Sequence, residues 1–400
     1  MEKRLFLAVV IPVLWFAGCA REGAVDSVSG ATARRGPPAP VLLERFMPGA
    51  MADGMVKIAV LVNREEGDDS RQFIEGCVAE GRSMGFTVDS FVSGADEQRC
   101  RELAAGIVQA DYDGLVFSYG DVGFSYDLLK PAAEKGMRIV TFEALPYRDG
   151  KSIDGLVATF QDDYRLARLS LETLLSYTQG GDTRSNEGRP ARVIRVSCDS
   201  GVTFLDRRAW EFDRLKDEGK IQEAALVRLG NLENPRSAAW EALAAILPRF
   251  PHGSVDAVWV PWDEFAVGCA EALAAAGRQD IKLFSIGIST DDMRLMQRHA
   301  DIWIANTAVD PKLAGTVTMR IIAARLAGET LADTFSFDPQ LVKTADLSRA
   351  VNMANIAALV PDWGDGRGLF DHYQWMDDVK TAEGKYFRIA PPGSPPKVGP

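Results

Sequence analysis

The chain is poor in the residue types that most often carry catalysis and metal binding. Its 400 residues include only three histidines and five cysteines, and no two cysteines form a C-x-x-C pair. No H-E-x-x-H, Walker loop or G-x-G-x-x-G stands at a strand-to-helix junction. The 45 Lys and Arg residues are outnumbered by 56 Asp and Glu residues, and the net charge is −11. This charge disfavours nucleic acid as a partner, because phosphate binding needs a basic face. We therefore expect no catalytic residue, no cofactor and no metal site.

Long apolar runs are lacking too. The run Leu5–Phe16 follows Lys3 and Arg4 and is too short for a comfortable membrane span. Small residues stand directly before Cys19, a pattern that resembles the bacterial lipoprotein signal, in which the cysteine is acylated and becomes the new N-terminus. We expect a signal peptide at 1–19 and a lipid anchor on Cys19. An ordinary signal peptide or an uncleaved anchor is the alternative, and each places the chain outside the cytoplasm.

The rest of the chain alternates strand and helix patterns after a tether. Residues 20–54 are rich in Gly, Ala, Pro and Arg without periodicity, which is typical of a flexible linker. Repeated β-α units whose strands are apolar throughout indicate parallel sheets with helices on both faces. The expected strands are 56–62, 86–91, 114–117, 138–142, 155–160, 192–196, 224–229, 256–260, 282–286 and 302–305. The expected helices are 70–84, one through Leu103 and Ile107, 126–135, 162–178, 206–218, 235–247, 265–276, 293–299 and 311–327.

One stretch organises the second half of this pattern. A short buried strand over 256–260 ends at Pro261, which cannot donate to a sheet ladder. Trp262 and Asp263 follow in the turn, and a helix begins with acids in its first turn, where free N–H groups favour negative charge. The stretch resembles the strand, turn and helix of the type I periplasmic sugar-binding proteins, in which Asn and Asp stand where this chain has Trp262 and Asp263.

The resemblance implies two doubly wound parallel-sheet lobes joined by a hinge. It covers about residues 56–344 and implies crossings between the lobes near 159–163, 306–310 and 335–338. We expect an N-terminal lobe of 55–160 plus 307–335 and a C-terminal lobe of 161–306 plus 336–350. Residues 351–400 form a C-terminal extension beyond the resemblance.

In such a fold the carboxyl ends of the strands face the ligand, so the loops there supply candidate binding residues. By resemblance Asp69 lies in a first-lobe loop with ligand contacts, Glu143 stands where the family often has an Asp, and Arg208 matches an Arg that reaches the ligand. The full candidate set is Asp69, Tyr119, Glu143, Arg208, Trp262, Asp263, Ser289 and Asn306.

Two departures from the family concern the ligand. Trp262 replaces an Asn, and Ile286-Gly287-Ile288 stands where sugar binders tend to carry Phe-Asp-Gly, so a second-lobe carboxylate is missing. An aromatic face packs on sugar C–H surfaces, planar rings and cations. We expect a sugar-like ligand with an apolar, aromatic or cationic part. The alternative is that Trp262 packs in the core against Phe265 or Trp259.

The sequence thus predicts a lipid-anchored, extracytoplasmic solute-binding protein. The resemblance implies an ABC importer permease as the partner that receives the ligand. Two alternatives stay open: a ligand-binding sensory subunit for a chemoreceptor or histidine kinase, and an extracytoplasmic α/β hydrolase. The sequence favours no enzyme, because no nucleophile stands in a recognisable setting.

Overall fold

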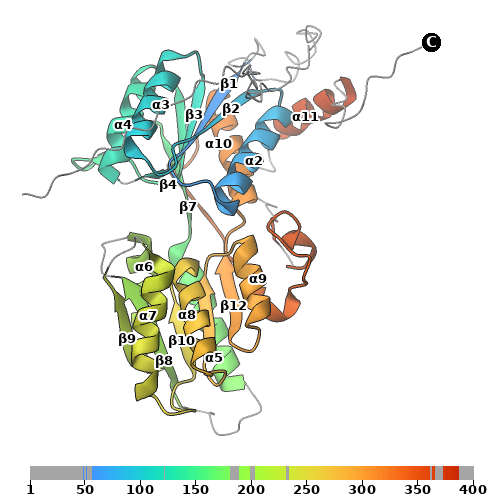
Figure 1. Ribbon diagram of the computed structural model, residues 1–400. Helices are drawn as coiled ribbons and strands as arrows, with labels where there is room; N and C mark the ends of the chain where they lie inside the picture. Colours follow the sequence, from blue (N-terminus) through green and yellow to red (C-terminus); the bar gives the residue numbers. More distant parts are fainter. Residues whose placement is uncertain are drawn as a thin grey trace, which may run out of the picture. The chain divides into compact units, whose positions relative to one another are not determined.

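A computed structural model describes residues 48, 51, 56–120, 122–180, 189–198, 203–230, 234–360, 363–364 and 373–386. The predicted signal peptide, Cys19 and nearly all of the tether lie outside these residues. Two six-stranded sheets and a two-stranded hairpin organise the chain (Figure 1). None of the described helices combines the length and the apolar character that a membrane span requires.

The first sheet and its helices form what we call the first lobe. Its strands are apolar almost throughout, as expected for a parallel sheet covered on both faces. One face packs against α2 (Asp68–Ser83) and α10 (Pro311–Leu326), and the other against α3 (Glu97–Gln109) and α4 (Val122–Glu134). In spatial order the strands are β13 (Thr334–Phe337), β7 (Val157–Gln161), β4 (Arg138–Ala144), β3 (Gly114–Gly120), β1 (Lys57–Val62) and β2 (Thr87–Val92).

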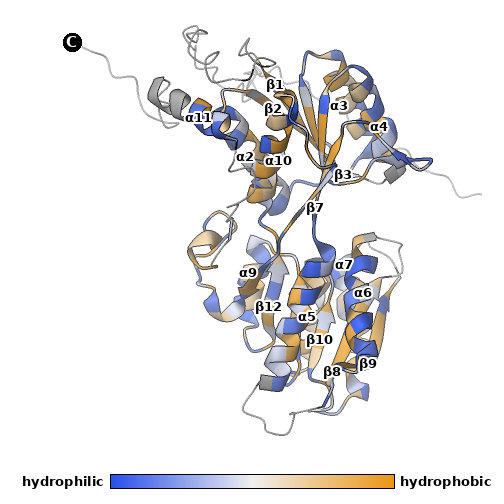
Figure 2. Cartoon of the chain, turned by 180° about the vertical axis from the view of Figure 1, so that it is seen from behind, coloured by the Kyte–Doolittle hydropathy of each residue, from blue (hydrophilic) through white to orange (hydrophobic). Residues whose placement is uncertain are grey.

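The second sheet and its helices form the second lobe, which repeats this architecture. Figure 2 shows hydrophobic colouring on its strands and much hydrophilic colouring on its helices. In spatial order the strands are β14 (Gln340–Lys343), β12 (Trp303–Ala308), β11 (Lys282–Ile286), β10 (Ala257–Val260), β8 (Ala191–Cys198) and β9 (Ile221–Leu229). The covering helices are α5 (Asp163–Gly180), α6 (Thr203–Asp217), α7 (Pro235–Ile246), α8 (Asp263–Ala275) and α9 (Thr290–Arg298).

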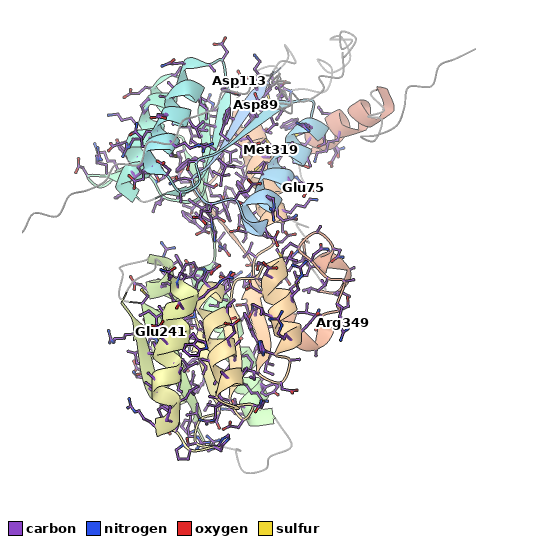
Figure 3. The ribbon with its side chains drawn as sticks, in the orientation of Figure 1. Glu75, Asp89, Asp113, Glu241, Met319 and Arg349 are labelled. Atoms are coloured by element: carbon purple, nitrogen blue, oxygen red, sulfur yellow. The ribbon has the colours of Figure 1, made fainter. Side chains whose placement is uncertain are left out.

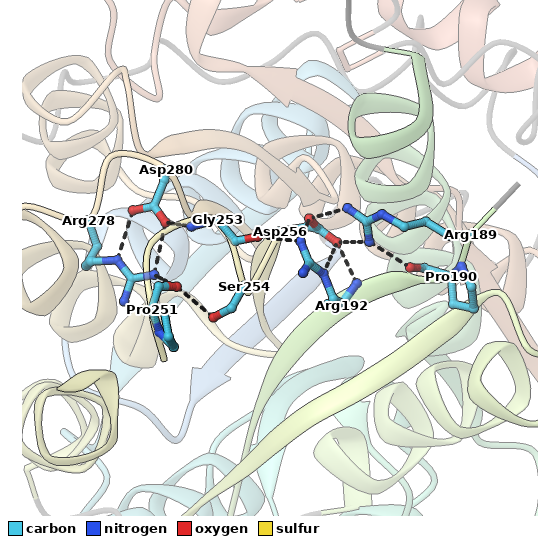
Figure 4. A network of polar contacts seen from close by, with 9 residues as sticks. All are labelled: Arg189, Pro190, Arg192, Pro251, Gly253, Ser254, Asp256, Arg278 and Asp280. Carbon is cyan, nitrogen blue, oxygen red and sulfur yellow. Dashed lines mark hydrogen bonds and ion pairs between the residues drawn. The ribbon is translucent and has the colours of Figure 1, made fainter. Parts of the chain in front are cut away.

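Ion pairs close the end of the second sheet where β8 and β10 begin. Asp256 accepts from Arg189 at 2.8 Å and from the backbone N–H of Arg192 at 2.7 Å, and Arg278 donates to Asp280 at 2.9 Å (Figure 4). The bonds from the two arginines hold the pKa of the Asp256 carboxyl well below its usual range although its partial burial opposes this. This end of the sheet is therefore occupied by structural ion pairs.

The two-sheet α/β fold confirms the predicted fold class, and the structure adds elements that the sequence pattern did not reveal. The chain changes sheet after β7, after β12 and after β13, and β13 pairs in parallel with β7. The strands β13 and β14 were expected only as a crossing. β14 runs antiparallel to β12, so the second sheet is not wholly parallel. The chain leaves the second sheet through β12 and enters it again through β14, two residues after β13 of the first sheet. A small hairpin of β5 (Tyr147–Arg148) and β6 (Lys151–Ser152) was also missed.

The segment predicted as a C-terminal extension contributes to both cores. Val351, Met353, Ile356 and Val360 are nearly fully buried in the second lobe. Helix α11 (Gln374–Tyr386) packs on the first lobe through Met376 and Val379, among other residues. These residues carry no periodic β-α pattern, so their burial follows only from the tertiary structure.

Helices α2 and α10 cross in very close contact at paired glycines. A Cβ atom added to Gly76 would lie 2.1 Å from the carbonyl oxygen of Lys312, and one added to Gly315 would lie 2.1 Å from that of Phe73. Glu75 also pairs with Lys312 at 2.6 Å (Figure 3, where Glu75 is labelled on α2). The glycines let the two backbones approach, and α10 is thereby fixed on the first lobe although it follows β12 of the second.

We predict that Gly76→Ala destabilises the protein by about 1–3 kcal/mol, since the new methyl group overlaps backbone atoms that cannot move independently. Gly106→Ala is the control, because Gly106 lies on helix α3 with open space around it. That change should leave stability unchanged or raise it by up to about 1 kcal/mol. Urea unfolding of both variants measures the difference, and equal stabilities would show that the α2–α10 crossing is not tight.

Candidate functional site

The carboxyl ends of the strands carry the polar side chains that the sequence singled out. Tyr119 and Glu143 end β3 and β4 and adopt left-handed backbone conformations, with φ of +61° and +53°. Such conformations cost on the order of 1–3 kcal/mol for a residue with a side chain, and they cluster at functional sites. The strain at two neighbouring strand ends therefore supports a site at this edge of the first sheet.

Arg64 joins the first-lobe part of the site, and the sequence analysis missed it. Its guanidinium lies 4.8 Å from the centre of the Tyr119 ring and forms an ion pair with Asp69. Tyr119 also contacts Phe142 edge-on at 5.7 Å. Asp69 is thus paired with Arg64, and the signal that could have revealed this is the position of Arg64 at the end of the first strand, directly before an acidic loop.

Glu143 lies next to the first crossing between the sheets. Its Oε1 accepts a hydrogen bond from the Gln161 N–H at 2.5 Å. Burial, and then the nearby Asp163, raise the pKa of Glu143 to about 7, while the Gln161 hydrogen bond and the arginines Arg208 and Arg207 oppose that rise. Glu143 is therefore a carboxyl group that changes its charge near neutral pH.

Arg208 is nearly fully buried and already has protein partners. It donates to Asp163 at 2.9 Å and to the carbonyl oxygen of Pro261 at 2.7 Å, and its guanidinium lies 4.8 Å from the centre of the Phe204 ring. These contacts connect α6 with the start of α5 and with the turn after β10. In this structure Arg208 holds the walls of the site together.

Trp262 and Asp263 occupy the turn between β10 and α8, and Trp262 is the N-cap residue of that helix. The half-buried Trp262 ring contacts Phe265 at 5.0 Å and Phe204 at 6.1 Å, both edge-on. The Asp263 carboxyl lies where a Cβ atom on Gly287 would be, with its carbon 2.8 Å from that position. A side chain at position 287 would therefore displace the Asp263 carboxyl.

Ser289 and Asn306 form hydrogen bonds to other residues of the second lobe. The Ser289 hydroxyl accepts from the Asp292 N–H at 3.1 Å and caps α9. Asn306 is fully buried: its Oδ1 accepts from Trp303 Nε1 at 2.6 Å, and its Nδ2 donates to the Gly287 carbonyl at 2.8 Å. Both side chains are engaged within the second lobe, so they position the Gly287 and α9 loops.

One further contact joins residues of the two lobes. The Asp68 carboxylate, in the first turn of α2, accepts from the Thr290 N–H at 2.9 Å, at the start of α9. A carboxylate at this place is favoured by the positive end of the α9 dipole. Among the residues that the structure describes, no group of three or more His, Cys, Asp or Glu is arranged to hold a metal ion.

A fold of two parallel-sheet lobes with polar groups at the strand ends defines a ligand-binding protein of the periplasmic type. The family model described as "Periplasmic binding protein domain" matches residues 58–330, and the chain belongs to this family. This confirms the resemblance seen in the sequence. None of the curated proteins compared with the chain matches it.

Solved structures of similar fold include a sugar ABC transporter protein from Yersinia enterocolitica, 29% identical, with a TM-score of 0.67, covering 84% of this chain and 98% of that one. A 5-methylthioribose transporter solute-binding protein from Thermotoga lettingae is 22% identical, with a TM-score of 0.65, covering 82% and 98%. A periplasmic ribose ABC transporter protein from Conexibacter woesei is 16% identical, with a TM-score of 0.63, covering 76% and 95%. The last two likenesses concern the fold.

We predict that Glu143 makes stability depend on pH around neutrality. Because its pKa is raised on folding, the folded state holds this proton more tightly than the unfolded state does. Its contribution to the free energy of unfolding is therefore most favourable below about pH 4.5 and is lost as pH rises to about 7. Urea unfolding from pH 4 to 8 should show the stability of the wild type falling relative to Glu143→Gln over this window.

Glu134→Gln is the control for Glu143, since it removes the same charge at an exposed carboxyl on α4, whose ion pair with Lys130 at 3.8 Å is open to solvent and contributes little. A stability difference between wild type and Glu143→Gln that stays constant from pH 4 to 8 would contradict a Glu143 pKa near 7.

Proposed function

We propose that the protein is an extracytoplasmic solute-binding lipoprotein that captures a sugar-like ligand and delivers it to an ABC importer. Membership in the periplasmic binding protein family supports the binding role, and that family is not typically enzymatic. The observation that carries the proposal is the set of polar and aromatic groups at the strand ends of both sheets. The partners are a small-molecule ligand, an ABC transporter permease and the membrane, reached through the lipid on Cys19.

In this proposal each lobe is built on one of the two sheets and contributes its own side chains to the ligand site. The N-terminal lobe comprises 55–160 plus 307–335 and the C-terminal lobe 161–306 plus 336–350, with a signal peptide at 1–19 and a tether at 20–54. The ligand lies between Arg64, Asp69, Tyr119 and Glu143 on one side and Trp262 and Asp263 on the other. Arg208, Ser289 and Asn306 complete the set of binding residues, chiefly by orienting these groups.

Trp262 and Phe204 favour a ligand with an apolar part. Their two rings meet edge-on next to Asp263, so a ligand there meets aromatic surface and a carboxyl group together. The Thermotoga lettingae protein of similar fold was solved with 5-methylthioribose. A sugar with an apolar substituent has the same combination of hydroxyl groups and apolar surface, and we propose this ligand class.

The lipid anchor is tested by Cys19→Ala. We expect the wild type in the membrane fraction and the variant in the soluble periplasmic fraction, because acylation at Cys19 is the proposed attachment. Stable anchoring needs more than one acyl chain, so mass spectrometry should find a diacylated N-terminal cysteine. A wild-type protein found wholly in the soluble fraction would refute the anchor.

The binding role of Trp262 is tested by Trp262→Ala, with 5-methylthioribose, D-ribose and allitol as first probes in calorimetry. We expect affinity for the ligand to fall at least about tenfold, which corresponds to about 1.4 kcal/mol. Because the ring is only half-buried, the loss of stability should stay below the roughly 3–5 kcal/mol typical of a fully buried aromatic residue.

Two tryptophans provide matched controls for this variant. Trp259→Ala removes a fully buried ring of β10 and should cost more stability, whereas Trp240→Ala removes an exposed ring of α7 and should change neither property. If Trp262→Ala behaves like Trp259→Ala and keeps its affinity for the ligand, the ring belongs to the core and the argument for an apolar ligand part is lost.

A further inference from the structure

The carboxylates around the site differ in how their charge is balanced. Asp69 is paired with Arg64, Asp163 with Arg208 at 2.9 Å, and Glu264 with Arg236 at 2.6 Å. Among the described residues Glu143 forms no such ion pair and accepts from the Gln161 N–H instead, and Asp263 and Asp292 are further exceptions. Within the described part of the chain, neither of them forms an ion pair with a basic side chain.

Asp263 and Asp292 meet at the loop that follows β11: the Asp263 carboxyl carbon lies 2.8 Å from the position of a Cβ atom on Gly287, and Ser289, two residues further on, accepts from the Asp292 N–H at 3.1 Å. Each carboxyl group contributes to the pKa of the other. Asp292 is 2% exposed, so its carboxyl group is shielded from water. Asp263 is the more exposed of the two, and its Oδ1 accepts from the Glu264 N–H at 3.0 Å. Gly287 leaves room for this arrangement, because a side chain there would displace the Asp263 carboxyl.

The buried partner is left with an unsatisfied oxygen. No donor among the described residues reaches Asp292 Oδ2, although it is shielded from water. A buried carboxylate oxygen without a donor is costly, and two carboxylates side by side need a proton or a cation between them. The pair is therefore an acceptor site that one proton or one cation can fill.

We propose that the Asp263–Asp292 pair, together with the Trp262 ring, is a subsite for a protonated amine on the sugar-like ligand. This inference rests on the proposed function, since it names a chemical group of the same ligand. Carboxylates supply the charge, and an aromatic face next to them attracts a cation further. An ammonium group on Asp263 supplies this positive charge in place of a proton.

The release of a proton when the ligand binds distinguishes this subsite from one that binds a sugar hydroxyl group. Burial and the neighbouring acids raise the pKa of Asp263, which favours a proton shared between the two carboxyl groups of the free protein. The groups that face the pair are Arg64 and Asp69 from the first lobe, Arg236 from α7 and Glu264 from α8. A ligand –NH₃⁺ that binds to the carboxylates displaces the shared proton, which leaves to the buffer.

The experiment compares amine and hydroxyl forms of the same sugar on the whole mature protein. The probes are D-glucosamine and D-glucose, D-galactosamine and D-galactose, and 2-amino-2-deoxy-D-ribose and D-ribose. Calorimetry at pH 7 in two buffers of different ionisation enthalpy gives the affinity and the number of protons released. We expect at least one amine to bind at least tenfold more tightly than its partner, with net proton release.

Three variants localise the effect. Asp263→Asn and Asp292→Asn should each reduce the amine preference to less than threefold and abolish proton release. Asp291→Asn, on the same turn of α9 but exposed and paired with Arg294, should retain both, because it removes the same charge away from the pair. Thermal unfolding checks folding, and Asp292→Asn should remain stable because its amide can donate to Asp263.

The outcomes separate this inference from the proposed function. A neutral sugar that binds as well as its amine, without proton release, overturns the ammonium subsite and leaves the solute-binding role intact. If none of the six probes binds, the subsite for amino sugars is refuted. If native mass spectrometry of protein purified from its own cells also finds no small molecule bound, the proposed function fails with it.

Discussion

Both sheets are covered by helices on both faces, and this constraint decides where the protein can hold polar chemistry. Side chains on either face of these strands enter a hydrophobic core, so a strand can present a functional group only where it ends. At one end of the second sheet, ion pairs such as Asp256 with Arg189 tie the loops together. The candidate binding groups occupy the carboxyl ends, where Tyr119, Glu143 and Asp263 stand.

At these strand ends, a few arginines form ion pairs with some of the carboxylates. Arg64 neutralises Asp69 while lying on Tyr119, and Arg208 neutralises Asp163 while holding the Pro261 turn. Each arginine therefore contacts an aromatic ring or a backbone carbonyl of the site in addition to its carboxylate. A guanidinium can do this because it is planar and has several donors. The carboxyl groups without such a partner have raised pKa values, and they are the groups that can respond to a ligand.

The segments that connect the lobes pack against elements of both lobes. Helix α10 crosses α2 at Gly76 and Gly315, so the strand β12 and the helix that follows it belong to different lobes. The pairing of β13 with β7 brings two of the crossings side by side. The C-terminal segment adds apolar side chains to both cores, with Met353 on the second lobe and Met376 on the first.

The sequence by itself determined the fold class, the order of the β-α units and the stretch around Trp262. Apolar runs of strand length and amphipathic helices are local patterns, and the glycines and Pro261 mark the ends of elements. The family followed from the same local residues. Short strands such as β13 and β14 lack that periodicity, and the burial of residues such as Val360 depends on partners far away in the sequence.

Only the tertiary structure decided how the site residues are partnered. Arg64 stood outside the predicted set because its contact with Tyr119 joins the ends of two different strands. Asn306 stays a predicted binding residue, and the structure adds that its amide contacts Trp303 and Gly287. Gly287 indicated a missing carboxylate, and the structure adds that a side chain there would meet the Asp263 carboxyl. A sequence specifies which groups exist, but hydrogen bonds and charge pairs depend on distances that the folded chain alone sets.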